Sequence, residues 1–202
     1  MIVGFAGALV LGLLAQTASP DGLVRRVEER SRRTTSLVAD FVQTYKSAAL
    51  GRELVERGTL QLKRPGRMRW EYVHPEKKTF VSDGKSFYFY VPAERQVIVR
   101  EQAGEQGIAV RLLSGEGGML SQFDVSPEGT AGRLKLVPKK PDPEVERAFV
   151  EADAEGRIVG IEIWDVQGNK SRFRFGRMRE NVALDDRQFR FEVPKGVAVI
   201  GG

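Results

Sequence analysis

The stretch GTLQLKRPGRMRWEYVHPEKKTFVSDGKSFYFY, residues 58–90, reads as four β-strands joined by tight turns. Successive side chains of a strand point to opposite faces of a sheet. In the first two strands one face is apolar and carries Leu60, Leu62, Met68, Trp70 and Tyr72. Arg64 falls on this same face, where a cation is costly unless it finds partners. Either a shift in the register of the strand turns Arg64 to the other face, or Arg64 is a functional residue.

The same two-residue period continues on both sides of this stretch. One face of these further strands carries Leu37, Ala39, Phe41, Ile161, Ile163, Phe173 and Phe175. Turn signals such as Pro65-Gly66, Asp83-Gly84 and Glu155-Gly156 recur at short intervals between the strands. Short strands with this punctuation are typical of an antiparallel all-β sheet rather than of alternating strands and helices.

Two helices interrupt the β pattern. Ser19-Pro20-Asp21 is a helix start with Ser as N-cap, and Leu23, Val24 and Val27 form the apolar stripe of a helix that ends before Thr34. Residues 107–114, bounded by glycines, predict a second, short helix. The sequence thus predicts a mainly β fold, a single strongly curved antiparallel sheet forming an open half-barrel, closed by short α-helices.

An ordinary packed core would explain most of the apolar positions. Two features favour a hydrophobic cavity instead. The helical cover is short for so broad a sheet, which leaves space between the two. Arg64 also stands where a packed core would have an aliphatic side chain.

The composition is that of a globular domain. The chain has 202 residues, 41% hydrophobic and 29% charged, with no cysteine and a formal net charge of +5. Without cysteine there is no disulfide framework, thiolate metal site or lipid-modified N-terminal Cys. The positive charge could attract nucleic acid or an anionic membrane surface. Because the cations are scattered among Glu and Asp, a solvated basic surface without a nucleic-acid partner is the preferred interpretation.

The N-terminus predicts export. Residues 1–18 contain an uncharged apolar run of signal-peptide length, followed by small residues suited to a signal peptidase. No Lys or Arg precedes the run, and an uncleaved anchor is the alternative. We interpret residues 1–18 as a signal peptide and residues 19–202 as one domain. An exported protein without cysteine suits the bacterial periplasm.

No pattern for catalysis emerges from the sequence. The single histidine, His74, precedes Pro75 in a turn, and no serine lies in a G-x-S-x-G context. Residues 83–86, DGKS, resemble the end of a phosphate-binding loop, but the first glycine of that motif is missing. Asp185-Asp186 is an acidic pair that a loop would leave solvated. We expect no enzyme activity, no metal site and no cofactor.

Several motifs together resemble one protein family. They are Phe41-x-Gln43, LKRPGRMRW at residues 62–70, VSDGK at residues 81–85, Tyr90-x-Pro92 with Gln96-Val97, and Phe189-x-Phe191-x-Val193-Pro194-x-Gly196-Val197. This combination and its spacing resemble LolA, the periplasmic lipoprotein carrier, over residues 20–199. The receptor LolB shares that fold but needs an acylated N-terminal cysteine, which this chain lacks.

The resemblance implies a function. In this family a hydrophobic cavity takes the acyl chains of lipoproteins released by an inner-membrane ABC transporter and delivers them to an outer-membrane receptor lipoprotein. It implies a soluble, monomeric carrier without a cofactor. The residues expected around the acyl chains are Phe41, Leu60, Leu62, Met68, Trp70, Tyr72, Phe80, Ile161, Ile163 and Phe173.

The resemblance also implies a lid. The short helix would cover the cavity with Ile108, Leu112 and Leu113, and Arg64 would hold it shut through hydrogen bonds to backbone groups of the helix near Ile108 to Leu113. Two departures from the family pattern bear on this lid: no proline stands at its start, and Arg111 lies within it.

Two other functions stay open at this point. The first uses the same architecture, as an envelope chaperone or carrier for another lipid or glycolipid that serves a dedicated exporter. The second, motivated by the net charge of +5, is a module that binds nucleic acid or an anionic surface.

Overall fold

The computed structural model describes residues 20–101, 107–115 and 117–201, and the predicted signal peptide lies outside these ranges. The helical elements are α1 (Pro20–Arg33), α2 (Ile108–Ser114), α3 (Met119–Gln122) and the 3-10 turns η1 (Pro92–Glu94) and η2 (Asp186–Phe189). The strands are β1 (Ser36–Lys46), β2 (Glu53–Lys63), β3 (Arg67–His74), β4 (Lys78–Asp83), β5 (Ser86–Val91), β6 (Gln96–Glu101), β7 (Phe123–Pro127), β8 (Arg133–Pro138), β9 (Arg147–Ala152), β10 (Ile158–Trp164), β11 (Lys170–Glu180) and β12 (Ala198–Ile200).

All of these strands form one 12-stranded sheet in the order β12-β6-β5-β4-β3-β2-β1-β11-β10-β9-β8-β7. Two meanders, β1 to β6 and β7 to β11, are joined by the antiparallel pairing of β1 with β11. The sheet is not closed, since β7 and β12 lie at its two ends. The predicted antiparallel half-barrel is confirmed, with one difference: the short β12 pairs with β6 in parallel.

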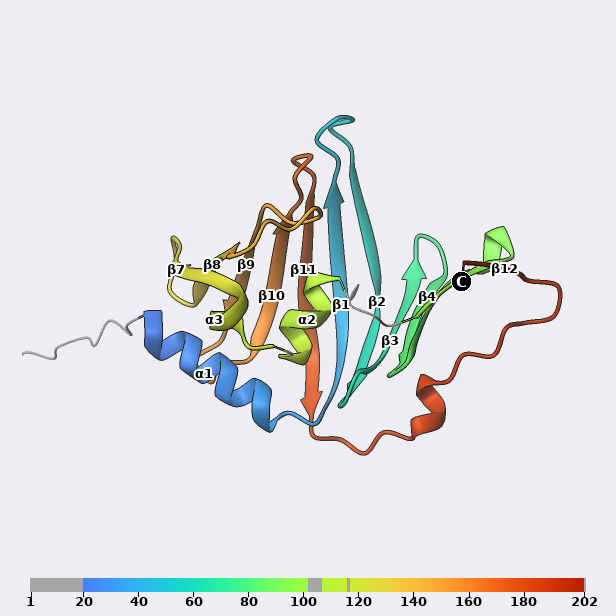
Figure 1. Ribbon diagram of the computed structural model, residues 1–202, viewed down its shortest axis with the longest axis horizontal. Helices are drawn as coiled ribbons and strands as arrows, with labels where there is room; N and C mark the ends of the chain where they lie inside the picture. The colour runs from blue at the N-terminus through green and yellow to red at the C-terminus, as the bar shows by residue number, and fades with distance from the viewer. Residues whose placement is uncertain (1–19, 102–106, 116, 202) are drawn as a thin grey trace, which may run out of the picture.

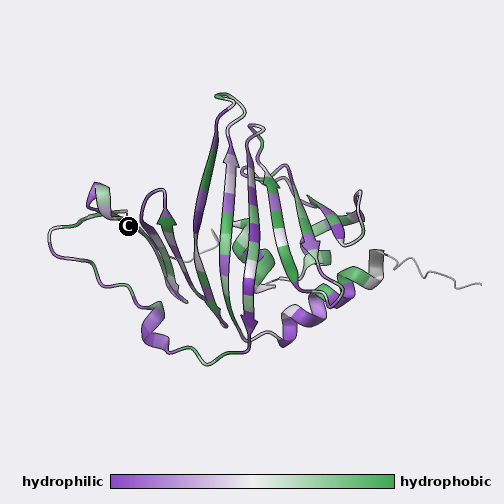
Figure 2. Cartoon of the chain, turned by 180° about the vertical axis from the view of Figure 1, so that it is seen from behind, coloured by the Kyte–Doolittle hydropathy of each residue, from purple (hydrophilic) through white to green (hydrophobic). Residues whose placement is uncertain are grey.

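The sheet is strongly curved, and the helices lie on its concave face (Figure 1). Seen from behind, the strands of the convex face are open to view, with hydrophilic and hydrophobic residues alternating along them (Figure 2). This alternation is expected when one face of each strand packs on a core and the other faces solvent. The core therefore lies between the concave face and the helices.

Helix α1 covers one end of the concave face, as its sequence predicts. Leu23, Val24 and Val27 are buried, and the helix ends at Arg33, directly before Thr34. The predicted N-cap, Ser19, lies outside the described residues. α3 was not expected, because a single short turn of helix leaves no periodic pattern in a sequence.

Position 58 in β2 requires a glycine, because the backbone of β3 and the ring of Phe41 come too close to leave room for a side chain. A Cβ at this position would lie 2.0 Å from the carbonyl oxygen of Glu71 and 2.8 Å from Cζ of Phe41. The register between β2 and β3 shifts beside it, between Arg57 and Gly58. The glycine thus lets the Phe41 ring pack directly on the strand that faces it.

Candidate functional site

A cavity of about 410 Å³ lies between the N-terminal part of α2 and the concave face of the sheet. Its walls are Met68, Trp70, Tyr72, Phe80, Phe87, Gly107, Ile108, Ala109, Val110, Glu144, Val145, Ile163, Asp165, Ser171 and Phe173. The volume is within the range of small-molecule sites, about 300–1,000 Å³. Most of the walls are aliphatic or aromatic, so the cavity suits an apolar ligand.

Six of the ten residues expected at the acyl site, together with Ile108 of the expected lid, lie around this cavity: Met68, Trp70, Tyr72, Phe80, Ile163 and Phe173. Strand parity brings these six together, since all face the concave side of β3, β4, β10 and β11. Ile108 comes from the first turn of α2. One site is thus built from both meanders and the lid.

Four other expected residues lie outside the cavity walls. Phe41, Leu60, Leu62 and Ile161 face the concave side but are buried at 0–3% exposure in the packed part of the core. They are in β1, β2 and β10, in the middle of the sheet. The alternation of side chains along a strand assigns each residue to a face of the sheet. It does not show whether a helix packs directly over that residue or leaves a cavity there.

Leu112 and Leu113 also lie away from the cavity. Leu112 borders a second, smaller cavity toward α1, and Leu113 is close to Val27 and Leu37. A helix presents successive residues at different angles around its axis, so only its first turn faces the large cavity.

The sequence analysis missed Phe87 and Val145. The alternating SFYFY of β5 would have indicated Phe87, whereas Val145 follows a proline-rich loop without a periodic pattern.

Aromatic rings in the walls of the cavity pack against one another and against neighbouring rings. The Phe41 and Trp70 ring centroids are 4.9 Å apart and those of Trp70 and Phe173 5.6 Å, both edge to face. Phe80 stacks on Phe89 with centroids 4.3 Å apart. Edge-to-face arrangements of this kind are favoured for aromatic pairs.

Arg64 lies directly after β2, at the opposite end of α2 from the cavity. Its Nη2 donates hydrogen bonds to the carbonyl oxygen of Ser114, the last residue of α2, and to Oγ of Ser31 in α1, the latter over 2.9 Å. The expected partners were backbone groups of the helix near Ile108 to Leu113, and Ser114 is the next residue of that helix. Ser31 was not expected. A guanidinium at the C-terminus of a helix also interacts favourably with the unpaired carbonyls there.

Gly115 makes room for this arrangement. Its φ of +65° is in the left-handed region, and a Cβ would lie 2.0 Å from Oγ of Ser31 and 2.9 Å from Nη2 of Arg64. A glycine that ends a helix in this conformation is common. Here it also lets α1, α2 and the end of β2 meet at one point.

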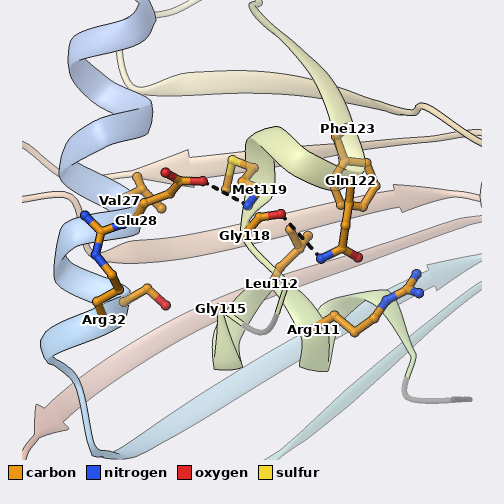
Figure 3. Close-up of a pocket in the computed structure, with 11 residues that line it drawn as sticks. Val27, Glu28, Arg32, Arg111, Leu112, Gly115, Gly118, Met119, Gln122 and Phe123 are labelled. Atoms are coloured by element: carbon orange, nitrogen blue, oxygen red, sulfur yellow. Dashed lines mark hydrogen bonds between the residues drawn. The ribbon is translucent and has the colours of Figure 1, made fainter.

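The smaller cavity, of about 200 Å³, lies between α1, α2 and α3 (Figure 3). Oε1 of Glu28 in α1 accepts hydrogen bonds from the backbone N–H groups of Met119, over 3.0 Å, and Leu120, over 3.3 Å. Arg111, the unusual residue in the lid, pairs with Asp142 at 3.3 Å. The helices are therefore tied to each other and to the loop before β9 by polar contacts.

The residues considered for catalysis lie outside the walls of the large cavity. His74 is exposed, and Asp83 accepts hydrogen bonds from the backbone N–H groups of Lys85 and Ser86, as in a hairpin turn. Asp186 accepts from Nζ of Lys63 at 2.5 Å and Nη1 of Arg67 at 2.6 Å. The hydrogen bond from Lys63 and the charge of Arg67 hold the pKa of Asp186 below its ordinary value.

Across the described ranges, no three His, Cys, Asp or Glu side chains come together in a way that could hold a metal ion. In the same ranges, no helix is both long enough and apolar enough to cross a membrane.

Comparisons with known proteins point to one family. Residues 32–192 match the family model described as outer membrane lipoprotein carrier protein LolA. An outer-membrane lipoprotein carrier protein of Chromobacterium violaceum is 30% identical over 98% of this chain and 95% of its own length. A protein of the same name from Chromohalobacter salexigens is 31% identical over 99% and 95%. An uncharacterized conserved protein from Thermus thermophilus shares the fold, with a TM-score of 0.54, 16% identity, and coverage of 89% of this chain and 97% of that one.

Proposed function

This chain belongs to the LolA family of outer membrane lipoprotein carrier proteins, and we propose that it binds the acyl chains of lipoproteins in the apolar cavity under α2. The family is one of carriers rather than of enzymes. The observation that carries the proposal is the cavity itself: about 410 Å³, walled by aromatic and aliphatic side chains from both meanders and from the lid.

Acyl chains supply enough free energy to bind at such a site. Each buried methylene contributes about 0.8 kcal/mol. A chain that enters the cavity contacts Trp70, Phe80 and Phe173 on the sheet and Ile108 on the lid. Further space for acyl chains would come from moving α2 away from the sheet.

Arg64 would act as the latch that holds α2 against the sheet in the empty carrier. Its contacts with Ser31 and Ser114 support this role. Hydrogen bonds to a charged donor contribute about 1.5–3 kcal/mol net. The burial of a few methylenes would offset that loss, so cargo could open the lid and the latch could favour its release.

The remaining steps follow from family membership. The carrier would work in the periplasm, exported by the signal peptide of residues 1–18, and would act as a monomer. It would take lipoproteins from an inner-membrane ABC transporter and deliver them to an outer-membrane acceptor. Delivery in this direction needs a carrier that binds its cargo reversibly.

Native mass spectrometry of the protein isolated from envelope extracts tests the proposal. The expected result is a one-to-one complex with an acylated protein or peptide, identified by fragmentation. A bound lipid without a peptide would replace lipoprotein carriage with transport of another lipid.

A matched pair of variants links the complex to the cavity. Phe80→Asp puts a charge into the cavity wall and is expected to abolish the complex. Val73→Asp makes the same change at a side chain that is 61% exposed, and is expected to leave the complex intact. Equal retention of cargo by both variants would contradict binding in this cavity.

A further inference from the structure

Four polar side chains form a cluster on the concave face, next to the cavity. Gln43 of β1 lies opposite Glu56 of β2, and Tyr72 of β3 lies opposite Lys78 of β4. Gln43 shares its face with Phe41, and Lys78 shares its face with Phe80. We call Gln43, Glu56, Tyr72 and Lys78 the polar cluster.

The members of the polar cluster contact one another. The phenol of Tyr72 donates a hydrogen bond to Oε1 of Gln43 over 2.6 Å. Nζ of Lys78 is 2.6 Å from Oε1 of Glu56 and 4.3 Å from the centroid of the Tyr72 ring. Glu56 is only 5% exposed, whereas the side chain of Lys78 keeps 23% of its surface accessible.

Stability alone does not explain this cluster. Removing two charges from water costs several kcal/mol each, and a buried ion pair is often no more stabilising than apolar side chains of similar volume. The positions next to it on the concave face, Phe41 and Leu60, are apolar and almost fully buried. An ion pair at this place on an otherwise apolar surface indicates a polar ligand group.

The polar cluster continues the wall of the cavity. Tyr72 belongs to both, because its ring borders the cavity and its hydroxyl reaches Gln43. Phe80, another wall residue, lies two positions from Lys78 on the same face of β4. Gln43 lies near the end of β1 and Glu56 near the start of β2, so these two members lie close to the hairpin that joins the two strands. A ligand that fills the cavity with hydrocarbon can therefore bring its polar end to Lys78 and Glu56.

We propose that the polar cluster binds the linker between acyl chains and peptide, with Lys78 donating to ester or amide carbonyl oxygens and Glu56 accepting from an amide N–H. The inference rests on the proposed function and adds a second subsite to it. A carbonyl carried to the edge of an apolar cavity loses its water and is costly to leave without a partner. Lys78 has three donors, which allows it to bind a carbonyl while it stays paired with Glu56.

The test compares a ligand that has the linker with one that lacks it. The two probes are a synthetic diacylglyceryl-cysteine peptide and the hydrocarbon dye diphenylhexatriene. The double variant Glu56→Leu/Lys78→Met removes both charges together, so neither remains buried without its partner. We expect its Kd for the lipopeptide to rise about tenfold, as the loss of a hydrogen bond to a charged group predicts, with the Kd for the dye unchanged.

Two further variants serve as controls. Lys63→Met removes a lysine whose partner, Asp186, is outside the cavity, and is expected to change neither affinity. Lys78→Arg keeps a cationic donor beside Glu56, and its lipopeptide affinity should stay closer to that of the wild type than to that of the double variant.

The outcomes separate the subsite from the carrier function. If the wild type binds the lipopeptide and the double variant binds it equally well, the subsite is overturned and the proposed function stands. An equal loss of lipopeptide and dye would also overturn the subsite, because the substitutions would then act on the cavity as a whole. If the wild type binds the dye but not the lipopeptide, the proposed function fails and the subsite with it.

Discussion

The two ends of α2 cover the same concave face with opposite results. At the C-terminal end, Arg64 donates hydrogen bonds to Ser114 of α2 and to Ser31 of α1, and Leu62 is 3% exposed. At the N-terminal end, Gly107 and Ile108 lie over a cavity of about 410 Å³. We call these the closed end and the open end. The strands below have the same apolar alternation in both places, so the difference comes from the helices.

The comparison shows how one sheet serves two purposes. At the closed end, side chains of α1 and α2 fill the space over the strands, as Val27 and Leu113 do beside Leu37. At the open end, α1 is absent from the cavity walls, and large rings such as Trp70 and Phe80 leave space between them. Stability is thus expected to depend on the closed end and binding on the open end.

The largest expected difference between the ends is in stability. Leu60, at 0% exposure, lies in the packed core, whereas Phe87 is a half-buried wall of the cavity. Leu60→Ala should lower the free energy of unfolding by about 3 kcal/mol through loss of burial and formation of a cavity. Phe87→Ala should cost about 1 kcal/mol, because its ring already borders open space. Denaturant unfolding measures both, and equal losses would remove the distinction between the ends.

The next largest effect concerns the latch. Arg64→Leu should still bind lipopeptide but transfer it to an acceptor about tenfold more slowly, since the proposed latch would contribute about 1.5–3 kcal/mol to the closed state. Transfer between purified carrier and acceptor membranes measures this rate. Arg67→Leu is the control, because Arg67 pairs with Asp186 outside the cavity. Transfer by Arg64→Leu at the wild-type rate would show that the closed end does not control release.

A smaller effect is expected at Gly115, which is not among the walls of the large cavity. Gly115→Ala would force an alanine into a left-handed conformation, which costs about 1–2 kcal/mol of stability. It would also bring the new Cβ against Ser31 and Arg64. Hydrogen exchange should then become faster at the amides of Leu112 and Leu113 at the closed end. Exchange at Met68 and Trp70 in β3 serves as the internal control, and faster exchange there as well would indicate general destabilisation.

The smallest effect sharpens the comparison at the open end. Burial, together with the charge of Glu56, raises the pKa of the Tyr72 phenol above its ordinary value. The protonated phenol is therefore favoured in the folded state. The stabilisation from the protonated Tyr72 phenol is complete below about pH 10, the pKa of tyrosine in the unfolded chain. This stabilisation is lost as the pH rises further. Tyr72→Phe should lose less stability than the wild type between about pH 9 and pH 11. Unfolding curves at the two pH values test this, and identical losses would mean that water reaches the phenol.

Strand parity predicted the face of each residue well, and the depth of burial poorly. The alternation of Leu60 and Leu62 with polar neighbours placed them on the concave face, where they lie. Whether such a residue is packed or borders a cavity depends on the helix above it. That helix is far away in sequence, so a period of two residues contains no information about it.

The latch and the polar cluster illustrate the same limit. A cation on an apolar face indicated that Arg64 needed partners, and the resemblance to LolA indicated the lid, but Ser31 belongs to another helix. Glu56 and Lys78 gave no signal, because charged residues near strand ends are usually solvated. Only the pairing of β2 with β3 and of β3 with β4 brings Glu56 and Lys78 together on the concave face.

The pairing of β1 with β11 sets an order for folding. Each meander can form from strands that are neighbours in the sequence, whereas Val42 must find Arg174 across most of the chain. Contacts between distant segments form slowly, because a long loop must close before they stabilise anything. The cavity has walls on both sides of this seam, Trp70 from one meander and Phe173 from the other. A complete cavity therefore exists only once the β1–β11 ladder has formed, because either meander alone supplies only part of its walls.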